Sequence, residues 1–152
     1  MSTENGGKPM KLIVEFDGGS RGNPGPAGFG VVVRDARDPD TPLVTAGRFI
    51  GRATNNVAEY SGLVFAIEKA VELGATDLTV RGDSELVIKQ MKGIYRVKNA
   101  NLRPHYERAC KAAEQIGSVR YEHNLRDKNE TADKLANLAM NRKGDVDDLI
   151  DA

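Results

Sequence analysis

The apolar pattern of the chain changes near residue 54, and this change constrains the fold more than any other feature. Before it, β-like apolar runs at residues 11–16, 29–34 and 43–50 follow one another across turn-rich connections. After it, apolar residues recur at helical spacing from Val57 to Val71. Consecutive strands on short connections predict an antiparallel meander, and the helical spacing predicts a helix that packs on it.

The second half of the chain alternates between helix and strand signals. Strands are predicted at residues 77–81 and 119–123, and Gly74 provides a stop for the first helix. Ser84 is an expected N-cap. Further helices are predicted over residues 84–92, 102–116 and 129–142. The resulting order β-β-β-α-β-α-α-β-α indicates an α/β fold, with a mixed five-stranded sheet (three antiparallel strands, then two parallel strands) flanked by helices.

Length and composition favour one cytoplasmic domain. The 152 residues suit a single domain with its own core. No apolar run approaches the roughly 20 residues needed to cross a bilayer, and the polar start of the chain lacks the apolar stretch of a signal peptide. We therefore predict a cytoplasmic protein with no membrane partner, and a monomer by default. The only cysteine, Cys110, excludes an intramolecular disulfide and a thiolate metal cage.

The chain divides into three predicted parts, and its charge is unevenly spread among them. Residues 1–9 are expected to form a flexible leader, residues 10–143 the folded domain and residues 144–152 an acidic tail. The formal net charge is zero, but bases outnumber acids between residues 81 and 111. Such a local basic face is adequate for contact with a polyanion backbone. An ordinary solvated surface explains the same charges equally well.

Four acidic residues occupy places that a structural role explains poorly. Two end predicted strands and two lie near the start of predicted helices: Asp17, Asp83, Glu59 and Asp133. Singly, each fits a turn-initiating aspartate or an acid favoured by a helix dipole. Together they would repel, because two carboxylates about 4 Å apart cost on the order of 4 kcal/mol at an effective dielectric of 20. Mg²⁺ prefers such oxygen ligands, so the set favours a two-metal phosphodiester hydrolase.

The order and context of these acids closely resemble the type I ribonuclease H family. In that family a strand ends in Asp-Gly-Ser/Gly, a helix carries Glu after Asn-Asn, a second strand ends in Asp-Ser, and the last helix contains Asn-x-x-Ala-Asp-x-Leu-Ala. The corresponding segments here are residues 16–20 (FDGGS), 55–59 (NNVAE), 82–84 (GDS) and 129–136 (NETADKLA). The resemblance covers about residues 10–142 and implies a ribonuclease H-like fold, in the compact archaeal-like form without a basic protrusion.

The resemblance also implies an activity. Members of the family hydrolyse the RNA strand of RNA–DNA hybrids by a two-metal mechanism that leaves 5′-phosphate and 3′-hydroxyl ends. The four acids would then hold two Mg²⁺ ions, with Mn²⁺ as the alternative. His123 lies where bacterial-type relatives carry a mobile histidine, and Arg126 where compact relatives carry an important arginine. Their division of labour is open, and His123 could also be an ordinary residue at a strand end.

Substrate contacts are implied by the same resemblance. They would come from the turn after the first strand, from the start of the first helix and from the start of the last helix. Glycines permit close approach of a backbone, and contacts to 2′-hydroxyls distinguish RNA from DNA. The implied residues are Gly18, Gly19, Ser20, Arg21, Gly22, Asn23, Thr54, Asn55, Asn56 and Asn129.

Three departures from the family pattern qualify these expectations. Glu85 stands where many bacterial members have glutamine, and an acid is a poorer contact for RNA. A short connector at residues 93–99 replaces the basic protrusion, so hybrid affinity should be weaker or rest on nearby bases (Arg96, Lys98 and Arg103). In the tail, the apolar residues Val146, Leu149 and Ile150 could dock on the sheet edge, or the acids could keep the tail solvated.

Two other functions fit the sequence less well. A non-catalytic hybrid-binding module would gain from losing acids that repel phosphate, yet all four acids are present. Another nuclease of the wider ribonuclease H-like superfamily would place its acids in different motifs.

Overall fold

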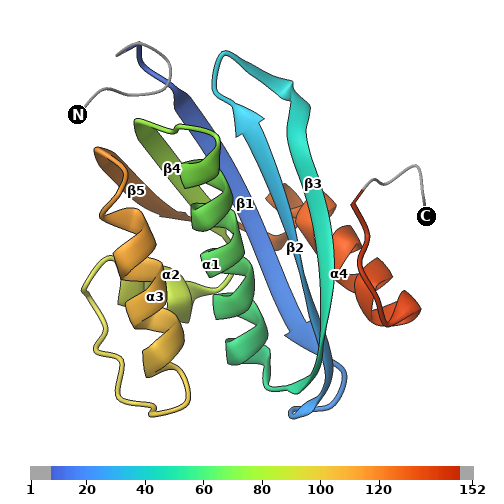
Figure 1. The fold of residues 1–152 in the computed structure, drawn as a ribbon. Helices are drawn as coiled ribbons and strands as arrows, with labels where there is room; N and C mark the ends of the chain where they lie inside the picture. Colours follow the sequence, from blue (N-terminus) through green and yellow to red (C-terminus); the bar gives the residue numbers. More distant parts are fainter. Residues whose placement is uncertain (1–7, 148–152) are drawn as a thin grey trace.

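The computed structural model describes residues 8–147 and contains one mixed sheet with helices on both faces (Figure 1). Its strands are β1 (Lys11–Ser20), β2 (Gly25–Asp35), β3 (Asp38–Ala53), β4 (Asp77–Gly82) and β5 (Ser118–His123). Its helices are α1 (Asn55–Glu72), α2 (Glu85–Met91), α3 (Arg103–Ala113), the short 3₁₀ helix η1 (Arg126–Lys128) and α4 (Glu130–Arg142).

The sheet has the strand order β3-β2-β1-β4-β5. Strands β1, β2 and β3 pair antiparallel, whereas β4 pairs parallel with both β1 and β5. The predicted α/β architecture is thereby confirmed, including three antiparallel strands followed by two parallel ones. Strand β1 is central, so residues at its end are flanked by elements from both halves of the chain.

Two apolar clusters hold the helices on opposite faces of the sheet. On one face, alternate residues of β1 (Leu12, Val14 and Phe16) are buried in the main core together with α1 and α3. On the other face, Leu135 of α4 packs with Val32 of β2 in a smaller cluster. Because successive side chains of a strand point to opposite faces, Asp17 lies on the face that α4 covers, opposite to its neighbour Phe16.

Strands β1, β2 and β3 are longer than the sequence pattern predicted, and β2 already begins at Gly25 where a turn was expected. Strand β1 continues through the glycines to Ser20, because Gly19 pairs with Gly28 and backbone hydrogen bonds need no side chain. Strand β3 begins at Asp38, where a polar loop was expected. Proline residues within it are tolerated because β3 is an edge strand. The prediction for the last helix, from about residue 129 to residue 142, was accurate.

The tail residues 144–147, here termed the C-terminal strap, lie along the edge strand β3. Val146 exchanges backbone hydrogen bonds with Gly47 at 2.5 and 2.9 Å and is fully buried against α4. The side chain of Arg48 forms ion pairs with Asp145 and Asp147. Docking of Val146 on the sheet edge therefore occurs, while Leu149 and Ile150 lie outside the described residues, as do residues 1–7 of the expected leader.

Between residues 8 and 147, the helices are all too short or too polar to span a bilayer.

Candidate metal centre

The register of two parallel strands places two aspartates side by side. The ladder between β1 and β4 ends at the pair Phe16 and Gly82. The next residue of each chain segment is an aspartate, Asp17 on β1 and Asp83 after β4. Since parallel neighbours end at the same edge of a sheet, both carboxylates emerge together where the ladder opens.

Helix α1 brings a third carboxylate to this opening from the core face. Gly18 permits the approach, because a Cβ atom there would lie only 2.5 Å from the backbone nitrogen of Glu59. The backbone N–H of Gly18 also acts on the Glu59 carboxylate, in the direction that lowers its pKa. Because a Cβ atom would not fit, a glycine is required at position 18, where the strand and helix backbones meet. Thr54 starts the helix as its N-cap by accepting a hydrogen bond from the Val57 amide at 3.2 Å.

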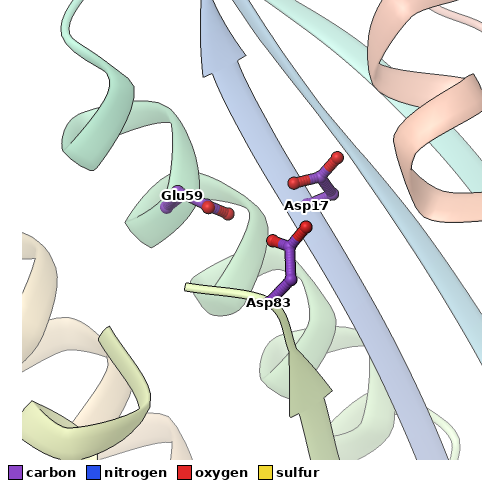
Figure 2. A group of neighbouring side chains, drawn as sticks. All are labelled: Asp17, Glu59 and Asp83. Atoms are coloured by element: carbon purple, nitrogen blue, oxygen red, sulfur yellow. The ribbon is translucent and has the colours of Figure 1, made fainter. Parts of the chain in front are cut away.

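The three carboxylates form one cluster, here termed the carboxylate centre. Asp17, Glu59 and Asp83 each offer an oxygen, and these oxygens all lie within 4.8 Å of one another. Figure 2 shows the three side chains converging from β1, α1 and the end of β4. Asp133, the fourth predicted acid, lies on α4 beside the cluster, close enough to raise the pKa of Asp17.

Burial and mutual repulsion shift the ionisation of the carboxylate centre. Burial is the main cause that raises the pKa of Asp17 to about 8, followed by the hydrogen bond with Asp133 and the charge of Asp83. Burial also raises the pKa of Glu59 well above its ordinary value, with the charges of Asp17 and Asp83 adding to it. Asp17 and Glu59 are only 7% and 9% exposed. Both therefore favour the protonated form until a cation joins them.

The donor set fits a hard divalent cation. All ligand atoms are carboxylate oxygens, the class that Mg²⁺ prefers. One of them, Oε1 of Glu59, is buried and has no hydrogen-bond partner among residues 8–147. A buried acceptor without a partner is costly, so a bound cation would satisfy an atom that the protein leaves unsatisfied.

Two basic side chains lie next to Asp83. The Nε atom of Arg126 is 3.7 Å from Oδ2 of Asp83, although the Arg126 side chain is 85% exposed. The Nε2 atom of His123 is 3.2 Å from the Asp83 backbone oxygen. His123 is paired with Gly82 at the end of β5, so the sheet register brings it to the same edge. The structure thus places both predicted residues at the rim of the centre.

A cleft of about 330 Å³ opens beside the carboxylates. Ten residues that the sequence nominated line it: Asp17, Gly18, Gly19, Ser20, Arg21, Asn55, Asn56, Glu59, Arg126 and Asp133. Three further lining residues, all on α4, were not predicted from the sequence, and these are Ala136, Asn137 and Met140. They follow Asp133 by three, four and seven positions, so helical periodicity from Asp133 is the signal that could have found them.

The loop between β1 and β2 is fastened to the start of α1 by two asparagines. Oδ1 of Asn55 accepts from the Ser20 amide at 2.7 Å, and Oδ1 of Asn23 accepts from the Asn55 amide at 3.0 Å. The Ser20 hydroxyl donates to the Ala53 oxygen at 2.7 Å. Gly22 turns the loop with a φ of +85°. Because both asparagine oxygens are used in this way, their side-chain N–H₂ groups are left as donors.

Asn129 and Glu85 lie in different settings. Asn129 is buried at the start of α4, away from the cleft surface. Glu85 lies in the first turn of α2, on the surface, 3.7 Å from the Nζ atom of Lys89 four residues later.

Comparisons with known proteins place this arrangement in a family. The family described as "Reverse transcriptase-like" matches residues 15–139. In Mycobacterium tuberculosis, the bifunctional protein Rv2228c is 51% identical over 131 residues, which are 86% of this chain and 36% of that protein. Ribonuclease HI of Halobacterium salinarum is 44% identical over 126 residues, 82% of this chain and 62% of that protein. The chain therefore spans less than two thirds of these curated relatives.

Solved structures agree over nearly their whole length. The N-terminal RNase H domain of Rv2228c matches with a TM-score of 0.85 and 49% identity, covering 88% of this chain and 95% of that one. The RNase H1 of Halobacterium salinarum matches with a TM-score of 0.83 and 40% identity, covering 87% and 98%. LC11-RNase H1, solved in complex with an RNA/DNA hybrid, matches with a TM-score of 0.81 and 37% identity, covering 87% and 98%. With this likeness in sequence and fold, the chain belongs to the type I ribonuclease H family.

Proposed function

We propose that this chain is a metal-dependent endoribonuclease that hydrolyses the RNA strand of RNA–DNA hybrids. The observation that carries the proposal is the carboxylate centre, whose three oxygens lie within 4.8 Å of one another beside an open cleft. A related protein, LC11-RNase H1, was solved with an RNA/DNA hybrid bound. An RNA–DNA hybrid is accordingly the proposed substrate of this chain.

Asp17, Glu59 and Asp83, with Asp133 beside them, are proposed to hold two Mg²⁺ ions at the scissile phosphate. When bound, such ions activate water and offset the charge that develops on the phosphate and on the leaving 3′-oxygen. The carboxylates contribute fixed oxygen ligands on β1, α1 and the end of β4, which need no rearrangement to converge. The products would carry 5′-phosphate and 3′-hydroxyl ends.

The fastened loop supplies the proposed reading of RNA. The side-chain N–H₂ groups of Asn23 and Asn55 are free to donate, because their oxygens accept from backbone amides. Donors suit the 2′-hydroxyl oxygens and the base acceptors that every base pair shows in the minor groove. Recognition would therefore depend on the RNA strand and not on its base sequence.

His123 and Arg126 are proposed to act at the rim of the centre, next to Asp83. His123 is proposed to deliver a proton to the leaving oxygen, a general-acid role that histidine often fills. The guanidinium of Arg126 is proposed to hold a phosphate. Affinity for the DNA strand of the hybrid would rest on three exposed basic side chains in or near the connector at residues 93–99, which are Arg96, Lys98 and Arg103.

A cleavage assay tests the proposal. A labelled RNA–DNA hybrid should be cut with Mg²⁺ and left intact with EDTA, and the RNA strand should carry the cuts. Retention of the hybrid on the protein without any cleavage in Mg²⁺ or Mn²⁺ would support a binding module instead. Cleavage of duplex DNA in preference to the hybrid would support another nuclease of the superfamily. Gel filtration of the same sample tests the monomer that we propose with this function.

A further inference from the structure

Asn129 is the least exposed of the buried polar side chains among residues 8–147, at 1% exposure. The family resemblance implied that it contacts the substrate. It does not line the cleft, and a side chain enclosed to this degree has no surface to offer a nucleic acid. Its place therefore calls for a different role.

The side chain of Asn129 ties α4 to the central strand. Its Nδ2 group donates a hydrogen bond to the backbone oxygen of Phe16 at 2.9 Å. That oxygen belongs to the peptide group that leads directly into Asp17. The contact joins residues 113 positions apart in the sequence, so it is a tertiary connection and not a local turn.

The backbone of Asn129 holds the other end of the connection. Its oxygen accepts a hydrogen bond from the Asp133 amide at 3.1 Å, which forms the first turn of α4. An asparagine before a helix ordinarily caps that helix with its side chain. Here the side chain makes no cap hydrogen bond in α4, and it is directed to β1 instead. One residue thus links the strand that carries Asp17 to the turn that carries Asp133.

The second polar atom of the side chain strengthens this interpretation. Oδ1 of Asn129 is buried and has no hydrogen-bond partner within the part of the chain that the structure describes. A position that served only to fill the core would hold an apolar side chain, because an unpartnered buried amide oxygen costs free energy. The amide is therefore retained for its donor, which is the group that reaches Phe16.

We propose that Asn129 is a positioning residue that sets the distance between Asp17 and Asp133 and makes no contact with the hybrid. The inference rests on the proposed function, since it assigns Asn129 to the support of the same metal centre. Asn129 acts through the two carboxylates, whose spacing determines how well they hold a divalent cation together.

Two substitutions and a matched control test the proposal. Asn129→Ala removes the donor, and Asn129→Asp keeps the side-chain shape while replacing the donor with an acceptor. Asn141→Ala is the control, because Asn141 lies on the same helix but is exposed. For each protein, Mg²⁺ affinity would be measured by calorimetry without substrate, hybrid affinity in EDTA, and kcat and KM with Mg²⁺. Thermal unfolding would report whether each variant is folded.

We expect Mg²⁺ affinity and kcat to fall about 10- to 100-fold in both Asn129 variants, the loss typical of groups that orient metal ligands. Hybrid affinity in EDTA should equal that of the unchanged protein, and Asn141→Ala should match it in every measurement. Weakened hybrid affinity in EDTA with unchanged Mg²⁺ affinity would overturn the proposal in favour of direct substrate contact. Unchanged Mg²⁺ affinity and kcat in folded variants would overturn it as well.

A measurement on the unchanged chain covers the case in which neither variant folds. By NMR, the side-chain amide protons of Asn129 should exchange slowly with solvent and should keep their chemical shifts when hybrid is added in EDTA. Rapid exchange, or a shift on hybrid addition, would contradict the proposal. The calorimetry and the NMR need no cleavage, so a failure of the proposed function would appear in the activity assay alone.

Discussion

The carboxylate centre and the C-terminal strap both gather acids at the sheet, but they treat the charge in opposite ways. In the strap, the carboxylates of Asp145 and Asp147 are 63% and 70% exposed, and both pair with Arg48. In the centre, Asp17 and Glu59 are buried and face other acids. The strap's acids are paired with a base of the chain itself, whereas the centre's acids face one another in a group that could hold a metal ion. Under the proposed function, the difference separates acids that serve the fold from acids that serve chemistry.

The largest expected effect comes from neutralising one acid of the centre. Asp17→Asn keeps the shape of the side chain but removes a charged ligand, so Mg²⁺-dependent hybrid cleavage should fall roughly 1000-fold or more, in line with the several kcal/mol that metal-assisted charge stabilisation supplies. Initial rates under saturating hybrid would measure it. Asp147→Asn in the strap is the matched control and should cleave at the normal rate. Comparable losses in both variants would erase the distinction between the two regions.

The next effect is on stability and depends on pH. The pKa of Asp17 is raised to about 8 from an ordinary 3.8, so its contribution to stability in EDTA is complete below about pH 4 and is lost as the pH rises through 8. In the Asp17→Asn variant, the side chain at this position cannot ionise. The variant should therefore match the unchanged protein at pH 3.5 and exceed it at pH 9 by on the order of a few kcal/mol.

Urea unfolding in EDTA at the two pH values measures this difference. Saturating Mg²⁺ at pH 9 should restore the free energy of unfolding of the unchanged protein. It should raise that of the variant much less, because the cation replaces the proton only where the carboxylate is present. A constant difference between the two proteins across the pH range would contradict the raised pKa.

A third test moves helix α1 without replacing any of the acids. Gly18→Ala would put a Cβ atom 2.5 Å from the Glu59 backbone nitrogen, so α1 must shift away from β1. A displacement of about 1 Å at a catalytic group can cost roughly 100-fold in rate. Gly19→Ala is the steric control, because no atom lies within 4 Å of a Cβ at that position. Calorimetric Mg²⁺ affinity should fall for the first variant and hold for the second, and equal affinities would show that the close approach is not needed.

These contrasts also show what the sequence could reveal. The four acids, the cap at Ser84 and the extent of α4 follow from local pattern, because strand ends, caps and helical periodicity are written in neighbouring residues. The proximity of the acids was inferred from repulsion and family likeness, and the ladder ending at Phe16 and Gly82 provides its geometric cause. That register joins segments distant in the chain and has no local signal.

The residues that sequence analysis missed or placed differently share one property, which is dependence on a distant partner. Asn129 has the local pattern of an exposed helix cap, and only the backbone oxygen of Phe16 explains why it is buried. Val146 was one of several tail residues that could dock, and its pairing with Gly47 depends on an edge left open by β3. The length of β3 likewise depends on its pairing with β2 and not on its own polar start.

The smallest expected effect lies in the strap. Arg48→Gln leaves Asp145 and Asp147 without their cation, yet both remain exposed to water and screened by salt. Exposed ion pairs contribute about 0.2–1 kcal/mol each, so urea unfolding should show a loss in this range that shrinks at high salt, with cleavage unchanged. Lys69→Gln is a suitable control, because Lys69 also lies over the Phe65 ring but pairs with neither aspartate. A loss of several kcal/mol, or a loss of cleavage, would mean that the strap's charges support the carboxylate centre and that the two regions are not independent.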